Sequence, residues 1–309
     1  QTCALPICAM AETASWYGPG FHGRRAADGS RFAQDALTAA GLTPLVTLTG
    51  SPAWANGGRP PNYAPNDGTG FAAFAGALDV TFAAGTYSAT QYEIVSAGSV
   101  SGGFGTITTT NLPAGFGVTV TTTATKVFLN LAPLPAVTTT TTSLPANATT
   151  VTISGANFDA ATPANNAVTF NNGATGTVTA ATATSLTVTF GTKPAAAGPL
   201  TAIVTTKGLS SGSANQVATV IPVISAATAN LAATATSFTI NGFGFSTTLA
   251  NNTVTLSSGT GTVTAATNTQ LTVGLSGALS LGALTAQVAS NSQANGAAVQ
   301  VATVVSGPP

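Results

Sequence analysis

Charged residues are scarce in this sequence. Among 309 residues there are seven Lys and Arg and seven Asp and Glu, so the formal net charge is zero. Binding to nucleic acid or to an anionic membrane surface depends on clustered positive charge. With no basic field in the chain, the composition predicts no nucleic-acid partner. Only five charges follow residue 80, so the chain changes character there.

Histidine and cysteine are almost absent. His22 is the only histidine, and the two cysteines, Cys3 and Cys8, stand at the extreme N-terminus. A Ser-His-Asp triad or a multi-histidine metal site cannot be assembled without His22, which lies next to glycine and is expected in an exposed loop. The rest of the chain must be stable without disulfides. The sequence therefore predicts no metal site and no cofactor.

Long apolar runs are missing as well. Hydrophobic residues make up 44% of the chain, enough for a core, but they are mostly Ala and Val alternating with Thr. A membrane helix needs about 20 consecutive apolar residues, and no run approaches that length. We therefore expect no membrane span. The length is compatible with two or three domains.

The opening QTCALPICAM lacks the basic n-region and the long apolar h-region of a signal peptide. Its first seven residues back-translate to cag acg tgt gct ctt ccg atc, which looks like the end of a sequencing adapter. A natural N-terminal tail is the alternative. We expect residues 1–7 to be an adapter-derived artefact and leave them out of the reasoning about the fold.

Aromatic residues, glycine and arginine are dense in ASWYGPGFHGRRAADGSRFAQDALTAA, residues 14–40. This stretch resembles the start of the rare-lipoprotein-A-like double-psi β-barrel proteins of bacterial envelopes, some of which are septal lytic transglycosylases that cleave peptidoglycan. It covers under a third of such a barrel. The family continues with a histidine and later an Asn-Asp-Arg-Gly-Pro run that carries its acidic group, whereas Gly41 follows here and no such run appears. The resemblance rests on Ala14 to Gly18, Phe21, Gly23, Gly29, Phe32 and Ala36 to Ala40.

The carboxylates of this stretch do not make a catalytic pair. Glycan cleavage needs a positioned carboxylic acid, usually with a second carboxylate. Glu12, Asp28 and Asp35 are the acidic residues available, and Asp28 precedes Gly29 in a turn-like DGS. A solvated turn is the favoured role for Asp28. The stretch is therefore interpreted as the beginning of a barrel without its active site.

Residues 41–78 contain an apolar β run over Leu45 to Leu48, a Ser-Pro-Ala-Trp loop, a Pro-rich connection and an Ala- and Phe-rich segment that predicts a helix over Phe71 to Leu78. Together these elements resemble one strand-loop-helix unit of the retaining glycoside hydrolase barrels, and the resemblance implies that Trp54 lines a sugar cleft. A half-buried structural aromatic is the alternative for Trp54. A complete barrel takes roughly 250 residues, and the typical Asn-Glu-Pro acid motif is absent. Weak candidate glycan contacts are Trp16, Tyr17 and Trp54, and no catalytic, cofactor-binding or metal residue is assigned.

The first eighty residues thus join pieces of two families. One pattern stops and another starts at residues 40/41 and again at 78/81, without a linker. We interpret the chain as a chimera, produced by mis-assembly or by artificial generation. Because elements without their partner strands cannot bury both faces, residues 1–80 are expected to form an incomplete, poorly ordered mixed region.

Residues 81–133 show a period of two between turns made by Gly, Asn and Pro, which predicts strands. The segment resembles the last rungs of the β-helical passengers of autotransporter-type surface proteins. Tyr92, Gly98, Gly103, Phe104, Leu112 and Val127 stand at the expected places. A small antiparallel meander is the alternative.

An internal repeat is the strongest signal. ATTVTISGANF (148–158) recurs as ATSFTINGFGF (235–245), and GTVTAATATSLTV (176–188) recurs as GTVTAATNTQLTV (261–273). About 85 residues per copy is the size of a seven-strand sandwich. Each copy has a strand, then Gly-x-x-Phe, then Asn-Asn and a new strand. This order resembles that of the immunoglobulin-like, plexin, transcription-factor (IPT/TIG) repeats. We predict two tandem sandwiches, residues 134–222 and 223–309, and a Thr-rich linker over Val137 to Leu144.

Alternation predicts the core of each copy. Thr152, Thr169, Thr187 and Thr189 should face outward, and Gly155 and Gly242 should occupy places that a Cβ would obstruct. The inward set in the first copy is Val151, Ile153, Val168, Phe170, Leu186, Val188, Phe190, Ile203 and Val217. The second copy repeats it with Phe238, Ile240, Val254, Leu256, Leu271 and Val273.

Polar residues of the repeats offer little for a site. Asp159 alone cannot hold calcium, which needs six or more oxygen ligands and several carboxylates. Asn165, Asn166, Asn171 and Asn172 could line a sugar-binding loop, although asparagine in hairpin turns is the ordinary structural choice. No catalytic constellation emerges from the repeats.

These observations predict a mainly β protein with two tandem immunoglobulin-like sandwiches after a β-helix-like or meander segment and a poorly ordered mixed N-terminal region. The favoured function is a non-catalytic structural or adhesive protein that is secreted or displayed on a bacterial cell surface. The alternative is a peptidoglycan or polysaccharide hydrolase remnant with accessory repeats. Cell-wall or extracellular glycan and self-association through strand edges are the expected partners.

Overall fold

The computed structural model describes residues 3–5, 45–49, 71–74, 77–88, 90–96 and 99–307. Within these residues every regular element is a β-strand, apart from two short 3-10 helices at Pro163–Asn165 and Leu249–Asn251. The chain divides between residues 134 and 135 into two compact units. The mainly β fold class is confirmed.

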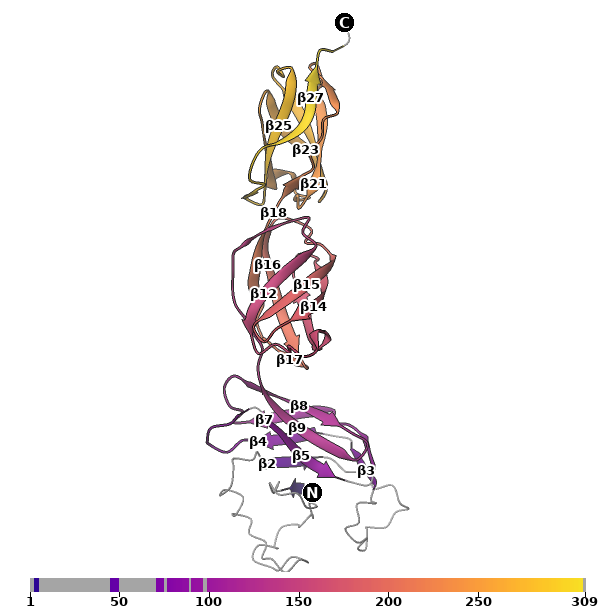
Figure 1. Cartoon of the computed structure of the whole chain (residues 1–309), viewed down its shortest axis with the longest axis vertical. Coiled ribbons are helices and arrows are strands. Elements are labelled where there is room, and N and C mark those ends of the chain that lie inside the picture. The colour runs from indigo at the N-terminus through magenta and orange to yellow at the C-terminus, as the bar shows by residue number, and fades with distance from the viewer. Residues whose placement is uncertain are drawn as a thin grey trace, which may run out of the picture. The chain divides into compact units, whose positions relative to one another are not determined.

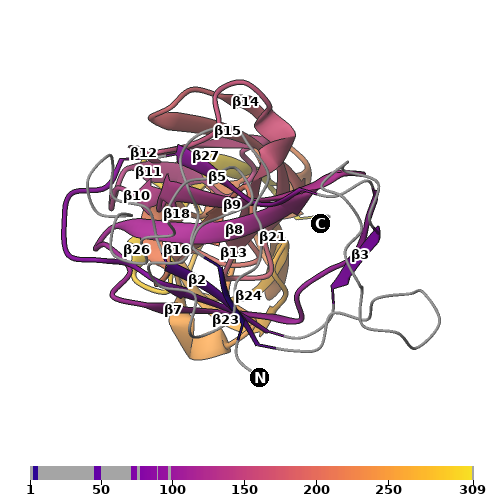
Figure 2. The same cartoon turned by 90° about the horizontal axis from the view of Figure 1, so that it is seen from below.

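The N-terminal unit holds sheets of mixed direction. One sheet has the order β1-β2-β4-β7, a second has the order β5-β9-β8, and β3 pairs with β6. Figure 2 shows β5, β8 and β9 side by side. The strands are β1 (Cys3–Leu5), β2 (Leu45–Thr49), β3 (Phe71–Phe74), β4 (Ala77–Thr81), β5 (Thr90–Ser96), β6 (Ser99–Gly102), β7 (Thr106–Thr110), β8 (Phe116–Thr122) and β9 (Lys126–Pro133).

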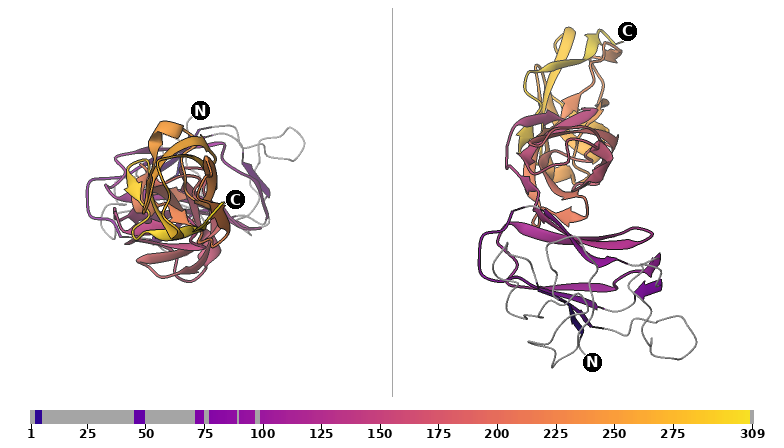
Figure 3. Two further views of the ribbon diagram at one scale, coloured as in Figure 1. Left: turned by 90° about the horizontal axis from the view of Figure 1, so that it is seen from above. Right: turned by 60° about the horizontal axis from the view of Figure 1, so that its bottom comes forward.

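One hydrophobic core lies between the two larger sheets of this unit. Leu78 and Val80 point inward from β4, and Leu129 and Leu131 point inward from β9. Alternate residues of a strand point to opposite faces, so each of these strands contributes every second side chain. The right-hand view of Figure 3 shows the sheets as separate layers.

The helix predicted over Phe71 to Leu78 is wrong. The segment forms β3 and the start of β4. β3 pairs in parallel with β6, and β4 pairs with β2 on one side and β7 on the other. The alanine content favoured a helix, but intrinsic propensity is a weak signal that tertiary pairing overrides. Leu78 and Val80, two positions apart, both enter the core as a strand requires.

Strand pairing in residues 77–133 is of two kinds. β3–β6 and β4–β7 are parallel, as successive rungs of a β-helix are, whereas β5, β9 and β8 are antiparallel, as in a meander. The resemblance to a β-helix end stays a prediction. β4 also runs across the predicted boundary between residues 80 and 81. Most of residues 1–80, and with them the predicted poor order of that region, lie outside the described residues.

The C-terminal unit contains a first β-sandwich, called sandwich one. Its two sheets have the orders β10-β12-β15-β14 and β11-β18-β16-β13, with β17 added to β16. Figure 1 shows β12, β15 and β14 as neighbours. The strands are β10 (Ala136–Val137), β11 (Ser143–Pro145), β12 (Thr150–Ala156), β13 (Asn166–Phe170), β14 (Thr175–Ala181), β15 (Ser185–Thr192), β16 (Gly198–Thr206), β17 (Leu209–Ser210) and β18 (Asn215–Ile221).

Sandwich two repeats this topology. Its sheets have the orders β19-β21-β24-β23 and β20-β27-β25-β22, with β26 added to β25. The register is also repeated, because Val151 faces Val188 and Phe238 faces Val273. The strands are β19 (Val223–Ile224), β20 (Asn230–Ala232), β21 (Ser237–Phe243), β22 (Asn252–Leu256), β23 (Thr260–Ala266), β24 (Gln270–Ser276), β25 (Gly282–Ser290), β26 (Gln293–Ala294) and β27 (Val299–Val305).

The predicted core is confirmed except at one residue. The inward set of both copies is buried or packs against the buried cluster. Ile203 is the exception, since the buried residues of β16 are Leu200, Ala202 and Val204. Ile203 and Val204 are adjacent apolar residues, so the sequence left the phase of this strand open. Leu200 fixes that phase by placing the even-numbered positions inside.

Val137 to Leu144, predicted as a linker, is the first edge of sandwich one. β10 pairs antiparallel with β12, and β11 pairs in parallel with β18, so this segment crosses from one sheet to the other. The amides of Thr138 and Thr140 donate to Ser154 O and Gln216 O. Its threonine-rich composition obscured two strands that are too short to show a period.

Gly155 and Gly242 occupy equivalent crowded places, as predicted. A Cβ on Gly155 would overlap the carbonyl oxygen of Ala136 and the ring of Phe158. A Cβ on Gly242 would overlap the carbonyl oxygen of Val223 and the ring of Phe245. Glycine is required at both positions because the first strand of each sandwich, β10 or β19, passes too close to leave room for a side chain.

Candidate functional site

The candidate glycan contacts Trp16, Tyr17 and Trp54 lie outside the described residues, as do His22 and Asp28. Their assignment therefore stays a prediction. Glu93 forms an ion pair with Lys126 at 2.6 Å on the surface of the β5–β9 pair.

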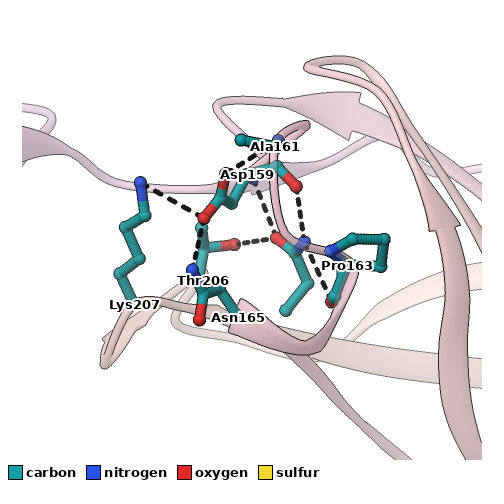
Figure 4. Close-up of polar contacts among 7 residues, drawn as sticks. Asp159, Ala161, Pro163, Asn165, Thr206 and Lys207 are labelled. Carbon is teal, nitrogen blue, oxygen red and sulfur yellow. Dashed lines mark hydrogen bonds and ion pairs between the residues drawn. The ribbon is translucent and has the colours of Figure 1, made fainter.

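Asp159 lies at the centre of a polar cluster, at the end of sandwich one where β12 finishes. Its side chain is 5% exposed, and Oδ2 accepts a hydrogen bond from Asn165 Nδ2 at 2.6 Å. The Ala161 amide donates to Oδ1 at 3.0 Å, and the Lys207 ammonium, from the turn after β16, lies 3.2 Å from Oδ2. Figure 4 shows Ala161, Asn165 and Lys207 around the carboxylate of Asp159.

These contacts all favour the ionised carboxylate. The pKa of Asp159 is lowered to about 2, chiefly by the hydrogen bond from Asn165. The Ala161 amide and Lys207 act in the same direction, against burial, which raises the pKa of a carboxyl group. Asp159 is therefore a fixed negative charge at neutral pH.

The cluster brings together the amine of Lys207, the carboxamide of Asn165 and the carboxylate of Asp159. These are the three groups that the formation of an amide bond between a lysine and an asparagine side chain requires. That reaction requires an uncharged amine and a carboxyl proton to polarise the amide. Lys207 is 64% exposed and its Nζ lies 3.2 Å from Asp159 Oδ2, so the two side chains form an ion pair at the surface. The arrangement therefore stabilises an ion pair and does not activate a nucleophile.

Beside the ion pair, Asn166 bridges β13 to the loop that carries Asp159. Its Oδ1 accepts from the Asp159 amide and from Thr206 Oγ1, both at 2.9 Å. Its Nδ2 donates to Asp159 O at 2.9 Å and to Pro163 O at 3.3 Å. Asn166 is buried, so each of these bonds satisfies a group that has little access to water.

Sandwich two contains the same bridge without the charges. Asn252 Oδ1 accepts from the Ser246 amide at 3.1 Å, and its Nδ2 donates to Ser246 O at 2.7 Å. Ser246 thus takes the place of Asp159, Ser290 that of Thr206, and Asn291 that of Lys207. The asparagine bridge is a structural feature of the fold, and the Asp159–Lys207 pair is particular to sandwich one.

Asn291 makes a contact that Lys207 does not. Its Nδ2 donates to the carbonyl oxygen of Ala197, in sandwich one, at 2.9 Å, and the Ala197 amide donates to Gly244 O at 2.8 Å. Phe243 packs against the core of sandwich one, with Lys193 Nζ 5.2 Å from its ring centroid. The two sandwiches are therefore joined by specific contacts between the β15–β16 loop of sandwich one and the residues at the C-terminal end of β21 in sandwich two.

The asparagines proposed for a sugar-binding loop use their amides within the fold. Asn171 Nδ2 donates to Pro199 O and Asn172 Nδ2 donates to Ala196 O. Their side-chain oxygens accept from the Thr201 and Ala196 amides. Asn171 thus joins the β13–β14 turn to β16, and Asn172 joins it to the loop that precedes β16, as expected of structural asparagines.

A groove of about 490 Å³ runs along the first edge of sandwich one. Threonine hydroxyls flank it, and Leu144, Val151 and Val217 are among its apolar walls. It follows the segment in which the chain crosses between the sheets. The lining residues are Thr138, Thr139, Thr140, Thr142, Ser143, Leu144, Val151, Thr152, Ser154, Val217 and Ala218.

Neither a metal-binding cluster nor a membrane-spanning helix is found among the described residues. No group of three or more His, Cys, Asp or Glu side chains in that part of the chain could hold a metal ion. No helix there has the length and apolar character needed to cross a bilayer.

The C-terminal unit consists of two tandem β-sandwiches in contact with each other. It therefore belongs to the class of proteins with immunoglobulin-like repeats. The IPT/TIG domain family matches residues 135–221, which are sandwich one. Sandwich two repeats its strand order and register.

The curated relatives match short stretches of this chain. A probable endolytic peptidoglycan transglycosylase RlpA of Synechocystis is 77% identical over 30 residues, 10% of this chain and 9% of that protein. The endolytic peptidoglycan transglycosylase RlpA of Campylobacter jejuni is 49% identical over 47 residues, 14% of this chain and 17% of that protein. The chain therefore spans less than a fifth of the length of either relative.

Solved structures of low identity are also similar. The Bacteroides ovatus glucan-locus protein SGBP-B, in complex with a mixed-linkage heptasaccharide, is 17% identical, with 61% of this chain and 52% of that chain covered and a TM-score of 0.22. The I67–I69 fragment of titin is 8% identical, with 78% of this chain and 98% of that chain covered and a TM-score of 0.24.

The sequence missed the roles of Asp159, Lys207 and Asn291. The sequence suggests for Asp159 only the role of a calcium ligand, which a single carboxylate cannot fill, and it suggests no role for the two lysines of sandwich one. The available signal was the replacement of Asp159, Lys207 and Thr206 by Ser246, Asn291 and Ser290 between otherwise similar copies. Polar residues that differ in concert between two repeats identify a shared contact.

Proposed function

We propose that this chain is a non-catalytic structural or adhesive protein of the bacterial cell surface or extracellular space, whose tandem sandwiches act as a spacer. The observation that carries the proposal is the junction between the sandwiches. Ala197 bonds to Gly244 through its amide and to Asn291 through its carbonyl, and Phe243 packs across the boundary. A junction with directional bonds restricts rotation between domains, which a spacer needs in order to hold its ends apart.

The N-terminal segment would supply the adhesive contact. Short identity to two peptidoglycan transglycosylases and the candidate aromatics Trp16, Tyr17 and Trp54 support a cell-wall or extracellular glycan as its partner. Aromatic rings bind sugar faces through apolar contact, and each lost contact costs about 1 kcal/mol, or roughly fivefold in affinity.

Glycan retention tests this role. Full-length protein is expected to be retained on insoluble peptidoglycan, and Trp16→Ala combined with Trp54→Ala, which removes two contacts, is expected to weaken retention roughly 25-fold. Leu249→Ala, at an exposed position of sandwich two, is the matched control and should leave retention unchanged. Equal retention of all three proteins would remove the adhesive part of the proposal.

A hydrolase remnant is the second candidate, because two proteins that match short stretches of this chain are named as peptidoglycan transglycosylases. Incubation of the full chain with peptidoglycan and with mixed-linkage β-glucan should release no soluble product. Release that disappears when Glu12, Asp28 and Asp35 are changed together to Gln or Asn would establish the enzyme instead.

Self-association through strand edges is a further partner prediction. Residues 134–309 carry only Asp159, Lys193 and Lys207 as charged side chains, so little repulsion separates copies near neutral pH. The edge strands β14 and β23 each contain a register shift, at Val178/Ala180 and Val263/Ala265, and such bulges discourage pairing. β13 and β22 end the opposite sheets without a shift and are the edges expected to pair.

Sedimentation of the full chain over a concentration series tests this prediction. We expect the mean mass to rise with concentration, and Thr169→Lys with Thr255→Lys, at exposed positions of β13 and β22, to suppress the rise. Thr177→Lys, on the shifted strand β14, is the control. A monomer at every concentration would contradict edge pairing.

The division into segments 1–80, 81–133, 134–222 and 223–309, and the chimeric origin, are also proposals. Leu78 and Val80 share a core with Ile94 and Leu129, so a seam at 78/81 would fall inside a folded unit. The seam at 40/41 is therefore the place to test. Long-read sequencing of the source should show a break there, and natural homologues continuous across it would contradict the chimera.

A further inference from the structure

The groove along the first edge of sandwich one lies where the chain changes sheets. β10 pairs with β12 only at Ala156 and Gly155, and β11 pairs with β18 from Thr219 onward. Residues 138–142, called here the crossing segment, run between these two pairings. Within the described part of the chain, no strand therefore lies beside Thr152 on that edge of β12. The opening is the groove of about 490 Å³, a volume within the roughly 300–1,000 Å³ of small-molecule sites.

Hydroxyl groups stand on both sides of this groove. Thr138, Thr139 and Thr142 are exposed on the crossing segment, and Thr152 and Ser154 are exposed on β12. The apolar lining residues are Leu144, Val151, Val217 and Ala218. No lining residue carries a charge, so the side chains of the groove offer only hydroxyls and apolar surface.

Sandwich two contains the same crossing with fewer hydroxyls. The Thr140 amide donates to Gln216 O and the Ala227 amide donates to Gln300 O, both at 2.9 Å, so these positions are equivalent. By this register, the threonines that sandwich two replaces with alanine are Thr139, Thr140 and Thr142. The crossing forms in both copies, so the fold does not require these three hydroxyls.

A lining position on β12 differs in size between the two copies. Val151 faces Val188, and Phe238 faces Val273, in the same register. Valine is smaller than phenylalanine, so this position takes up less space in sandwich one. Sandwich one thus has more hydroxyls and less side-chain volume around the same groove. Two differences that occur together at one place indicate a shared role.

We propose that the groove of sandwich one is a binding site for a neutral saccharide. A sugar ring carries hydroxyls around its rim and C–H groups on its faces. The threonine hydroxyls can both donate to and accept from the rim, because each is one donor and two acceptors. The apolar lining residues contact the faces, whereas a charged ligand would be buried there without a counter-charge. The inference goes beyond the proposed function, in which the sandwiches act only as a spacer.

An extended peptide is the alternative occupant, because it could add a strand to the free edge of β12. The Thr138 amide donates to Ser154 O on that edge, and alternate residues of a strand direct their backbone groups to the same side. Only Thr150 and Thr152 would therefore bond to an added strand. A saccharide uses the side-chain hydroxyls of both walls, so the groove favours the saccharide.

Titration with neutral saccharides tests the proposal. The full chain carries Trp16→Ala and Trp54→Ala, which remove the proposed N-terminal glycan contacts, so that the two proposals are tested separately. The probes are cellohexaose, maltohexaose and chitohexaose, and the readout is the NMR spectrum of valine and threonine methyl groups. We expect at least one probe to shift the signals of Val151, Val217 and Thr152. Saturation is expected in the millimolar range, because no aromatic ring lines the groove.

Two variants identify the groove by giving it the residues of sandwich two. Thr139→Ala with Thr140→Ala and Thr142→Ala removes hydroxyls from the crossing segment, and Val151→Phe fills space. Each is expected to weaken binding about tenfold or more, since several hydrogen bonds or the room for the ring are lost. The control removes three exposed threonines outside the groove and should bind as the parent does; its substitutions are Thr177→Ala, Thr179→Ala and Thr184→Ala.

Hydrogen exchange of β12 and β15 checks that each variant keeps its fold, which is expected because sandwich two folds with the same residues. Unchanged affinity in either groove variant overturns the proposal, and so does the absence of shifts at Val151 and Val217 with all three saccharides. A neutral peptide of alternating threonine and valine is the last probe. If it shifts the same signals at lower concentration than any saccharide, the groove is a strand-binding site and the proposal is overturned as well.

Discussion

The two sandwiches have the same topology and the same asparagine bridge, yet they use the loop beside that bridge differently. In sandwich one the loop carries Asp159, which is held by Asn165 and Lys207. In sandwich two the equivalent residue is Ser246, and Asn291 reaches across to sandwich one. The fold requires the bridge, whereas the residues around it determine whether that end is charged or docks on a neighbour.

Loss of the bridge has the largest expected effect and tests how far the two copies are alike. In Asn166→Ala the Asp159 amide, Asp159 O and the Thr206 hydroxyl lose their partner, which should reduce the stability of sandwich one by about 3 kcal/mol. Asn252→Ala should cost less, about 1–2 kcal/mol, because the Ser246 amide keeps a bond to Ser290 Oγ at 2.8 Å.

Native-state hydrogen exchange measures both losses, because it reports each sandwich separately where a single unfolding transition cannot. The control is Asn241→Ala, whose exposed side chain bonds only to Gln270 in the contacts of the described chain and should cost below about 0.5 kcal/mol. Equal losses for Asn166→Ala and Asn252→Ala would show that Ser290 provides no substitute acceptor.

Substitution at the turn after β12 and β21 should separate backbone strain from docking. Gly244 (φ 78°) and Asn157 (φ 62°) are equivalent and both left-handed, so alanine is strained at either position by about 1 kcal/mol. At Gly244 the new Cβ also meets Ala146 of the neighbouring sandwich. We therefore expect Gly244→Ala to cost about 2 kcal/mol, of which the excess over Asn157→Ala belongs to the junction.

Hydrogen exchange at the Ala197 amide reads this effect directly, because that amide donates to Gly244 O. It should exchange faster in Gly244→Ala and remain slow in Asn157→Ala. A similar rate in both variants would mean that the junction tolerates the added methyl group and that the two sandwiches are held by other contacts.

The sequence predicted what repeats at short range. The alternation of Val151 and Ile153 with threonine, and the recurrence of TGTVTAA as β14 and β23, defined strands, core and tandem organisation. Prediction from the sequence failed where the local residue pattern favours one secondary structure and pairing with distant strands imposes another. Alanine over Phe71 to Leu78 indicated a helix, yet β2, β6 and β7 supply strand partners that no local signal announces.

The polar contacts were beyond a reading of the sequence for a different reason. Asp159 and Lys207 meet because the β12 and β16 ends lie together, and Ala197 and Asn291 meet across 94 residues and two domains. No spacing rule connects such residues. Their detection required the fold, although the absence of Asp159 and Lys207 from the second copy was visible beforehand.

Acid should distinguish the sandwiches with the smallest effect of the three, since it acts only at low pH. The folded pKa of Asp159, about 2, lies below the ordinary value of 3.8, so its contacts stabilise the folded state when the carboxyl group is ionised. That stabilisation is complete above about pH 4 and is lost as the pH falls through 3.8 toward 2. Residues 223–309 contain no Asp, Glu, His, Cys, Tyr, Lys or Arg, so sandwich two has no side chain that titrates.

Hydrogen exchange at about pH 6 and near pH 2.5, corrected for the intrinsic exchange rate at each pH, checks this difference within one molecule. Protection of sandwich one should decrease on acidification, while protection of sandwich two stays constant and serves as the internal control. Asp159→Asn keeps the shape of the side chain, removes the titration and should make sandwich one as insensitive as its neighbour. If sandwich one of that variant still lost protection in acid, Asp159 would not be the group responsible for the difference between the two copies.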